Sequence, residues 1–391
     1  MPPALNPFVW GRPLEDLAKV VGMDDFAGDV ALTLKAQTNV AIFGPRNTGK
    51  STFLSVLARE LAVNHGPDAS PYVTVRIDLK RALSIPAFVS CVDDALKEHP
   101  SREVRTVARR ELEVMERELG FNLKVVRGSV KRGAKSPEAG EVLHAQLRSL
   151  TRLSDHVVVC FDEFQRLNRC PGDPLAIVGS ALLGTGTGNT SILFTGSIRE
   201  YLEMLLNNSR EPIFNQATKK RLPRISKADF REFLLFHYEA SGRQIADRAV
   251  DHLLDITDAH PGRTQQLAWQ TWEQHKRRPS HPLEVEDVQA AFEELMDDQQ
   301  ADFAVIEDAL ANGEEAEVTE RKALYVLADN PGTKLTSALL AERYGLGSHN
   351  AAARAMPRLG RRGLVEQERG TWRIIDPLLA EWLRLNSPFR D

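Results

Sequence analysis

Hydrophobic residues make up 42% of the 391-residue chain and charged residues 27%, and the formal net charge is -4. This length leaves room for two or three domains, each with a hydrophobic core. The N-terminal residues lack the apolar core of a signal peptide and no apolar run is as long as a membrane span, so we expect a cytoplasmic protein with no membrane partner. The cysteines, Cys91, Cys160 and Cys170, show no metal-ligand spacing.

Residues 44–51 read Gly-Pro-Arg-Asn-Thr-Gly-Lys-Ser, a complete phosphate-binding loop motif. The loop follows a short apolar run at residues 40–43 and opens an amphipathic helical pattern, which is the strand, loop and helix setting that the motif requires. Its backbone N–H groups and the helix dipole favour phosphate oxygens. We therefore expect a nucleoside triphosphate to bind at Gly44, Pro45, Arg46, Asn47, Thr48, Gly49, Lys50, Ser51 and Thr52.

Two side chains of this loop have specific predicted roles. Lys50 is expected to reach the β- and γ-phosphates, and the Ser51 hydroxyl is expected to ligate Mg²⁺. ATP is expected rather than GTP because the chain contains no Asn-Lys-x-Asp guanine motif.

Residues 72–78 are predicted to form a further strand. A charged helix then begins an excursion that continues as a hairpin at residues 121–126 and a basic loop at residues 127–135. The basic loop fits two interpretations equally, a nucleic-acid contact and a solvated insertion.

A continuous apolar run at residues 157–161 is typical of a strand that is buried on both faces of a parallel sheet. It ends in Asp162 and Glu163, and ligands of open α/β sheets bind beyond the carboxyl ends of the strands. We expect Asp162 to hold Mg²⁺ through water. Glu163 is expected to orient and polarise the attacking water, which makes Glu163, Lys50 and Asp162 the predicted catalytic residues.

Another strand is predicted at residues 191–195, followed by Gly196-Ser197. Thr195 and Ser197 are candidates for sensing the γ-phosphate, although small hydroxyl residues also simply end strands. The glycine-rich segment at residues 184–189 is interpreted as a connector, because it precedes a strand and lacks the last glycine of the dinucleotide-binding motif.

The pattern becomes helical from residue 226 to residue 300, after an alternation of strands and helices that predicts a parallel, doubly wound sheet. Within this helical region His260, Pro261 and Arg263 open a helix, and His260 or Arg263 could face the phosphates of the nucleotide. A histidine in the core at the start of a helix is an equally good interpretation of His260.

Residues 279–320 contain no lysine or arginine and many acidic residues, between regions that are basic. An acidic linker at residues 301–318 could mask the basic regions when nucleic acid is absent, while a solvated acidic helix explains the same pattern.

Residues 319–391 are predicted to form a separate unit. Helical stretches at residues 319–329, 335–344 and 348–359 precede two short strands at residues 363–367 and 372–375, which is the pattern of a winged helix-turn-helix. Arginine and asparagine suit base edges and phosphates. The residues expected to contact DNA are His349, Asn350, Arg354, Arg358, Arg361 and Arg362. Winged helices also serve as docking sites for proteins, so that alternative stays open.

These motifs together resemble those of the archaeal-type P-loop ATPases, a branch of the AAA+-like signal-transduction (STAND) ATPases that also occurs in bacteria. The resemblance covers nearly the whole chain. The matching segments are Asn6-Pro7-Phe8 with Gly11, the phosphate loop, Asp162-Glu163-Phe164-Gln165, Thr195-Gly196-Ser197, His260-Pro261 with Gln265-Gln266-Leu267-Ala268, and Asp376-Pro377 with Trp382-Leu383.

The resemblance implies an α/β P-loop NTPase with an AAA+-like parallel sheet, a helical lid over the nucleotide and a C-terminal winged helix-turn-helix. It adds Ser197, His260 and Pro261 to the nucleotide-binding residues. The chain departs from the family at Asn215-Gln216, where a Gly-Arg pair is usual. If that arginine acts on the γ-phosphate, its role must pass to Lys220, Arg221 or Arg224, or hydrolysis must be slow.

The sequence therefore predicts an ATPase domain at residues 1–225, a lid at 226–300, the acidic linker at 301–318 and the winged helix at 319–391. We expect an ATP- and Mg²⁺-dependent switch whose nucleotide state controls a winged helix on double-stranded DNA. The alternative is a module that binds ATP without hydrolysis and docks a protein partner in a regulatory or defence complex. Self-association into a homo-oligomer is compatible with both.

Overall fold

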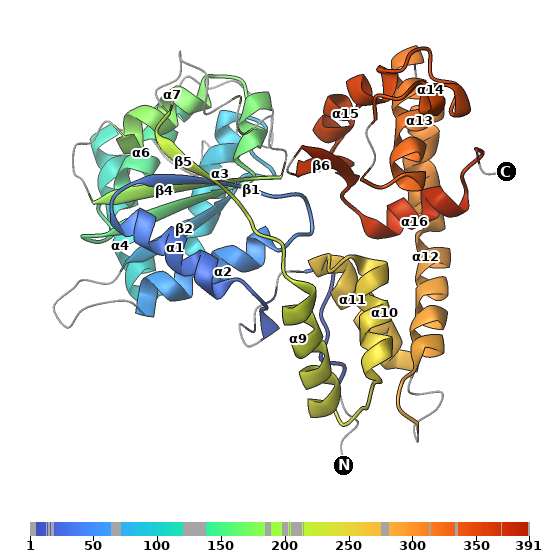
Figure 1. Cartoon of the computed structure of the whole chain (residues 1–391). Coiled ribbons are helices and arrows are strands. Elements are labelled where there is room, and N and C mark those ends of the chain that lie inside the picture. Colours follow the sequence, from blue (N-terminus) through green and yellow to red (C-terminus); the bar gives the residue numbers. More distant parts are fainter. Residues whose placement is uncertain are drawn as a thin grey trace. The chain divides into compact units, whose positions relative to one another are not determined.

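The computed structural model describes residues 5–12, 14, 16, 19–63, 72–119, 138–183, 189–197, 202, 204, 213, 215–274, 281–312, 314–332, 335–368 and 370–389 (Figure 1). The predicted hairpin at 121–126, the basic loop at 127–135 and residues 184–188 of the glycine-rich segment lie outside them. The chain divides into two compact units. The sheet unit comprises Met23–Gly44 and Lys50–Pro223, and the helical unit comprises Met1–Gly22, Pro45–Gly49 and Arg224–Asp391.

The sheet unit is built on a parallel sheet of five strands, which confirms the predicted fold class. The strand order is β2-β3-β4-β1-β5 (Figure 1). The strands are β1 (Asn39–Phe43), β2 (Val73–Asp78), β3 (Val157–Asp162), β4 (Thr190–Gly196) and β5 (Ala217–Arg221). Because β4 lies between β1 and β3, the residues that follow these three strands meet at one edge of the sheet.

The helical segments of the sheet unit cover the sheet. α1 contacts α2, β1 and β4, whereas α3 contacts β2 and packs with α6. The segments are α1 (Asp24–Lys35), α2 (Lys50–Val63), α3 (Ile85–Lys97), α4 (Arg102–Leu119), α6 (Glu138–Leu150), the 3-10 helix η2 (Phe164–Arg169), α7 (Pro174–Val178) and the π-helix η3 (Gly179–Leu183).

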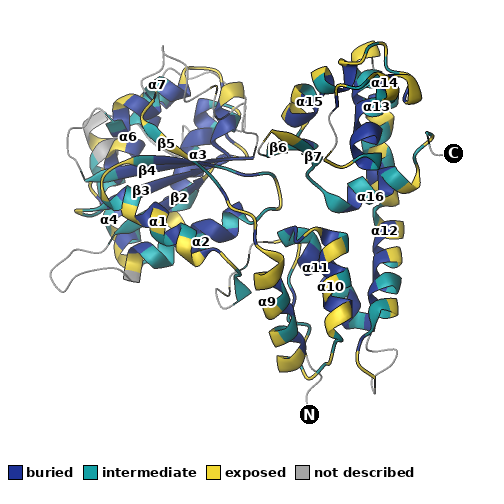
Figure 2. Cartoon of the chain, viewed as in Figure 1, coloured by how far each residue is buried: buried dark blue, intermediate teal, exposed yellow. Residues whose placement is uncertain are grey.

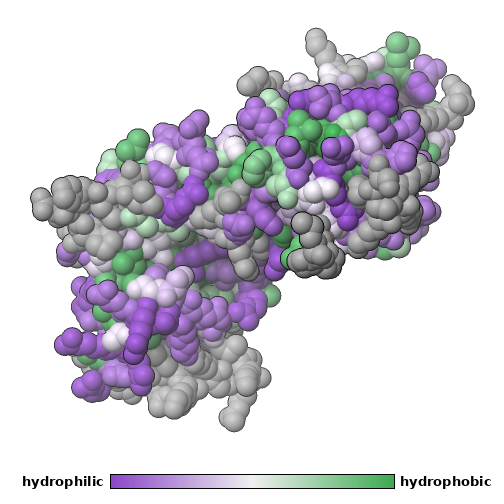
Figure 3. Space-filling model, turned by 90° about the horizontal axis from the view of Figure 1, so that it is seen from below, coloured by the Kyte–Doolittle hydropathy of each residue, from purple (hydrophilic) through white to green (hydrophobic). Residues whose placement is uncertain are grey.

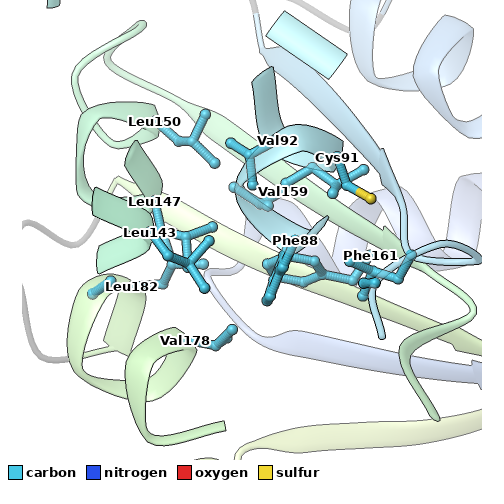
Figure 4. Packing of buried hydrophobic residues seen from close by; sticks show 14 of the residues in the cluster. Phe88, Cys91, Val92, Leu143, Leu147, Leu150, Val159, Phe161, Val178 and Leu182 are labelled. Atoms are coloured by element: carbon cyan, nitrogen blue, oxygen red, sulfur yellow. The ribbon is translucent and has the colours of Figure 1, made fainter. Parts of the chain in front are cut away.

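The main hydrophobic core lies between the sheet and the helices α3, α6 and α7 (Figure 4). Every residue of β3 is buried, but Val157, Val159 and Phe161 belong to this core while Val158 and Cys160 do not. This alternation follows from the period of two along a strand. It directs Asp162, the residue after Phe161, away from the core of Figure 4.

The helical unit contains three consecutive helices, α9 (Lys227–Ala240), α10 (Asp247–Thr257) and α11 (Pro261–Gln274). α9 and α10 each have an exposed face, whereas every residue of α11 is buried or half-buried (Figure 2). The N-terminal Asn6-Pro7-Phe8 segment packs on them. The Asn6 amide donates a hydrogen bond to the Trp269 carbonyl oxygen at 3.1 Å, and the buried Phe8 ring lies 4.8 Å from the Tyr238 ring. The segment therefore ties α9 to α11.

A single helix, α12 (Val285–Ala311), contains most of the acidic segment. Its first turn is closed by a capping box in which Glu284 and Asp287 exchange side-chain and backbone hydrogen bonds. Residues 301–311, which we assigned to a linker, are thus the carboxyl-terminal part of this helix. The absence of glycine and proline from residues 284–311 allows the helix to continue.

The last part of the helical unit contains three helices, two antiparallel strands and a final helix. The elements are α13 (Glu315–Asp329), α14 (Ala338–Arg343), α15 (Ala351–Arg362), β6 (Val365–Glu368), β7 (Thr371–Ile374) and α16 (Pro377–Leu385). The order of elements is the predicted one, but α15 begins at Ala351 and not at residue 348. His349 and Asn350 therefore precede the helix.

Among the described residues, no helix has the length and apolarity that crossing a membrane requires. The face shown in Figure 3 is mainly hydrophilic, and its hydrophobic residues lie in separate patches.

A leucine buried in the core of the sheet unit should contribute more to the free energy of unfolding than an exposed one. Leu147 is fully buried on α6, whereas Leu83 in the same unit is 54% exposed. We expect Leu147→Ala to lower the free energy of unfolding by about 2–5 kcal/mol, because a cavity remains, and Leu83→Ala to lower it by less than about 1 kcal/mol. Urea unfolding of both variants measures the difference, and equal losses would contradict this description of the core.

Candidate nucleotide site

The phosphate loop connects β1 to α2, as its sequence predicts. Asn47 and Gly49 have the positive φ angles 61° and 91°, which turn the backbone so that the chain can enter the helix at Lys50. Thr48 Oγ1 donates to the Pro45 carbonyl oxygen at 2.8 Å. The Lys50 ammonium is buried and donates to the Gly44 carbonyl oxygen at 2.7 Å, so it lies under the loop.

Asp162 lies at the carboxyl end of β3, beside the start of α2. The Ser51 hydroxyl is 3.4 Å from Asp162 Oδ2, so the two predicted Mg²⁺ ligands are brought together. Hydroxyl and carboxylate oxygens suit Mg²⁺, which keeps water ligands and takes phosphate oxygens as well. Within the described residues no cluster of three or more His, Cys, Asp or Glu side chains could hold a metal ion alone. This pair therefore fits Mg²⁺ that is bound together with a phosphate.

Asp162 is 1% exposed and is nevertheless held in its charged form. Burial acts to raise the pKa of Asp162. Attraction to Arg76 and hydrogen bonds from Thr195 and Arg76 outweigh this effect and lower the pKa below its ordinary value. Thr195 Oγ1 donates to Asp162 Oδ1 at 2.7 Å. Of the two candidate γ-phosphate sensors, Thr195 is thus a partner of the aspartate.

Arg76 is a site residue that the sequence analysis missed. Its guanidinium donates to Asp162 Oδ2 at 2.6 Å and approaches the Ser51 carbonyl oxygen at 3.4 Å. In the parallel register Arg76 lies opposite Cys160, so Arg76 and Asp162 point to the same face of the sheet. The signal in the sequence was a lone arginine within the strand at residues 72–78, which is otherwise mostly apolar.

Glu163 follows Asp162 in the left-handed conformation, with φ 59° and ψ 41°. This turn directs the Glu163 side chain toward Gln165 and Ser197, which both donate to Oε2, at 2.6 Å and 2.7 Å. The other carboxylate oxygen, Oε1, is 4.0 Å from Lys50 Nζ. Glu163, Lys50 and Ser197 are therefore gathered at one edge of the sheet. Gln165 belongs to a segment that matches the family, but no role was predicted for it.

His260 precedes the first turn of α11, whose first residue is Pro261. Burial lowers the pKa of His260 to about 4, against the attraction of Asp376, so the imidazole is neutral at pH 7. Its Nδ1 accepts a hydrogen bond from the Arg263 backbone N–H at 3.3 Å. Within the helical unit Gly262 lies against the phosphate loop, because a Cβ at Gly262 would come within 3.2 Å of the Asn47 carbonyl oxygen.

Arg263 contacts protein side chains. Its guanidinium binds Asp376, with Nε 3.0 Å from Oδ1, and donates to Gln266 and Gln299. Lys220 is ion-paired with Asp29, and Arg224 is ion-paired with Asp258 at 2.7 Å. Lys220 and Arg224, which could replace the missing arginine of the Gly-Arg pair, are thus engaged in ion pairs.

The six residues expected to contact DNA fall into two groups. Arg358 and Arg362 bind Glu320, a carboxylate 1% exposed on α13, at 2.6 Å and 2.8 Å, and so fasten α15 to α13. The other four lie on the exposed surface and are His349, Asn350, Arg354 and Arg361.

No protein-family model matches this sequence, and no curated protein matches it. Among solved structures, the chain is similar to a Walker-type ATPase of Pyrococcus abyssi, with a TM-score of 0.65 over 96% of this chain and 99% of that chain at 15% identity. It is also similar to the ORC2 protein of Aeropyrum pernix in its ADP form, with a TM-score of 0.54 over 95% and 94% of the chains at 15% identity. The ORC1 protein of Aeropyrum pernix in complex with DNA is similar with a TM-score of 0.51 over 96% of each chain at 16% identity. The chain has the fold of AAA+ P-loop ATPases.

Removal of the Arg76 guanidinium tests the charged state of Asp162. We expect Arg76→Met to lower the free energy of unfolding at pH 7 by about 3 kcal/mol, because a buried carboxylate loses its partner. The pKa of Asp162 is lowered in the fold, so its contribution is present above the unfolded pKa and is lost as the pH falls through the folded pKa. The difference between wild type and variant should therefore shrink as the pH falls below about 4.

Arg81→Met is the matched control in the same unit, because Arg81 pairs with Asp94 at the surface. Arg81→Met should lower the free energy of unfolding by less than about 1 kcal/mol. Chemical denaturation between acidic and neutral pH measures both variants. Equal and pH-independent losses would show that Arg76 does not stabilise the ionised aspartate.

Proposed function

We propose that this protein is an ATPase that binds ATP with Mg²⁺, hydrolyses it slowly and uses its nucleotide state to control a winged helix on double-stranded DNA. The observation that carries the proposal is one sheet edge at which Lys50, a buried Asp162 and Glu163 lie together. The likeness of the fold to a Walker-type ATPase of Pyrococcus abyssi supports it. The absence of an Asn-Lys-x-Asp motif favours ATP over GTP.

In this proposal each residue of the edge has one task. The backbone N–H groups of residues 44–49 bind the phosphates, and Lys50 exchanges its Gly44 carbonyl partner for phosphate oxygens. Ser51 and Asp162 hold Mg²⁺, which when bound neutralises charge on those oxygens. Glu163 orients the attacking water and accepts its proton.

Slow turnover follows from the ion pairs in which the candidate cations are engaged. Lys220 and Arg224, which could act on the γ-phosphate, are ion-paired with Asp29 and Asp258. An arginine from a second copy of the chain would complete such a site, so we propose self-association as the route to faster hydrolysis.

The helices α13, α14 and α15 with the strands β6 and β7 support a winged helix-turn-helix of the kind found in the STAND branch of these ATPases. His349, Asn350, Arg354 and Arg361 are exposed and carry groups that bind phosphates or base edges. The structurally similar ORC1 protein was solved in complex with DNA, which supports the proposal that this chain binds DNA. We propose a cytoplasmic location for this activity.

One observation favours the alternative, a module that docks a protein partner. Arg358 and Arg362 are engaged with Glu320, so fewer cations of α15 remain for the phosphates of DNA. The dependence of DNA binding on salt separates the two functions, because each phosphate contact releases counterions.

Glu163 is the proposed general base. Glu163→Gln keeps the size of the side chain and removes its ability to accept a proton, so we expect kcat for Mg²⁺-dependent ATP hydrolysis to fall about 100-fold or more while ATP still binds. Glu141→Gln, an exposed change on α6, is the control and should leave kcat unchanged. Steady-state turnover with and without duplex DNA measures the effect. Tight ATP binding without turnover in either condition would contradict hydrolysis.

Arg354 and Arg361 are exposed arginines of α15. Arg354→Ala and Arg361→Ala should each weaken binding to duplex DNA and reduce the slope of log K against log salt by about one. Arg148→Ala removes the same charge from an exposed position of α6 and is the control. Fluorescence anisotropy over a salt series gives the slopes. A slope that does not respond to either change would favour the protein-docking alternative.

A further inference from the structure

Glu163, Gln165 and Ser197 form a closed ring of three hydrogen bonds. Gln165 Nε2 is 2.6 Å from Glu163 Oε2 and 2.9 Å from Ser197 Oγ, and Ser197 Oγ is 2.7 Å from Glu163 Oε2. All three residues are buried. The ring lies at the sheet edge, where β3 and β4 end.

The donors available fix the direction of each bond. A carboxylate only accepts, an amide nitrogen has two hydrogens and a hydroxyl has one. Gln165 therefore donates to Glu163, and Ser197 donates its single proton to Glu163. The Gln165 hydrogen that points to Glu163 is shared with the nearby Ser197 oxygen, because the two N–H bonds of an amide diverge too widely for each to reach one of these close acceptors. The reversed amide would place the Gln165 oxygen against the Glu163 carboxylate, with no hydrogen between two acceptors.

This position of Gln165 carries a cost. Gln165 Oε1 is buried and has no hydrogen-bond partner among the described residues, which destabilises the fold. The close approach of Oε1 also requires Gly196, where a Cβ would lie 2.7 Å from it. A residue placed only for packing would not need an unpaired amide oxygen.

The ring keeps Glu163 from pairing closely with Lys50. Glu163 Oε1 is 4.0 Å from Lys50 Nζ, beyond the 2.7–2.9 Å of a charge-assisted hydrogen bond. If the bonds to Oε2 were lost, attraction would draw the carboxylate onto the ammonium. Both groups would then be less available to a phosphate and its attacking water.

We propose that Gln165 is a positioning residue, which holds the Glu163 carboxylate apart from Lys50 and ties it to Ser197. The inference rests on the proposed ATPase function. Ser197 has one proton, so it cannot donate to Glu163 and to a γ-phosphate at the same time. When Ser197 turns to the phosphate, the Gln165 N–H that points to Glu163 stays in place, and the base keeps its position.

The test is a double-mutant cycle on the full chain. Gln165→Leu removes both donors and the unpaired oxygen, so the protein should unfold at a temperature no lower than that of wild type. We expect kcat for ATP to fall about 10- to 100-fold with ATP Kd changed by less than about threefold. In the Glu163→Gln background, Gln165→Leu should cause no further loss, because the residue acts through Glu163.

Gln146→Leu is the matched control, because Gln146 is a fully buried glutamine of the same unit whose amide also has no partner among the described residues. It should leave kcat unchanged. The inference is overturned if Gln165→Leu keeps kcat within about twofold of wild type, or loses as much activity in the Glu163→Gln background as in wild type. A kcat loss that comes with a lower unfolding temperature would also overturn it, since that outcome indicates a structural role.

Failure of the proposed function has a different signature. In that case the wild-type protein itself does not bind ATP, or Glu163→Gln leaves its turnover unchanged. Either result overturns the proposed function and the role of Gln165 together. Failure of the inference alone leaves wild-type turnover sensitive to Glu163→Gln and affects only the Gln165 variants.

Discussion

A buried carboxylate must be matched by cations and hydrogen-bond donors, and Asp162 imposes this requirement on three strands and a helix at once. Arg76 from β2, Thr195 from β4 and Ser51 from α2 all reach its two oxygens. The parallel order of the strands makes this possible, because β3 lies between β2 and β4. The contacts that keep Asp162 charged therefore also hold β2, β4 and the start of α2 together at the end of β3.

The next residue, Glu163, is kept distinct from Asp162 by its backbone. A positive φ turns the chain immediately after β3, so the two acids point to different partners. Asp162 is bound by a cation and two hydroxyls, as suits a group that stays charged. Glu163 accepts from Gln165 and Ser197 and lies 4.0 Å from Lys50. Adjacent carboxylates thus acquire environments fit for a metal ligand and a general base.

Within the helical unit, ion pairs connect the start of α11 to the last elements of the chain. Arg263 binds Asp376, which caps α16, and Asp258 pairs with Arg224 and lies 3.5 Å from Arg373 of β7. Asp258 and Ala259 both adopt positive φ, which is strained for residues other than glycine. The segment before His260 is therefore held by Arg224 and by Arg373 of β7, whereas Asp376 holds the first turn of α11 through Arg263.

The sequence by itself determined the local elements, because the phosphate loop, the buried run at residues 157–161 and the helical patterns depend on spacing and composition alone. It also located Asp162 at the end of a strand, and Glu163 and Ser197 just beyond strand ends. Only the tertiary structure decided which polar side chains meet. The strand register brings Arg76 to Asp162, and a turn with positive φ brings Glu163 to Gln165. Arg358 and Arg362 form ion pairs with Glu320. The pairs of Arg76 and of Arg358 with Arg362 join segments far apart in the chain, and the Gln165 pair depends on an unusual backbone conformation, neither of which local patterns encode.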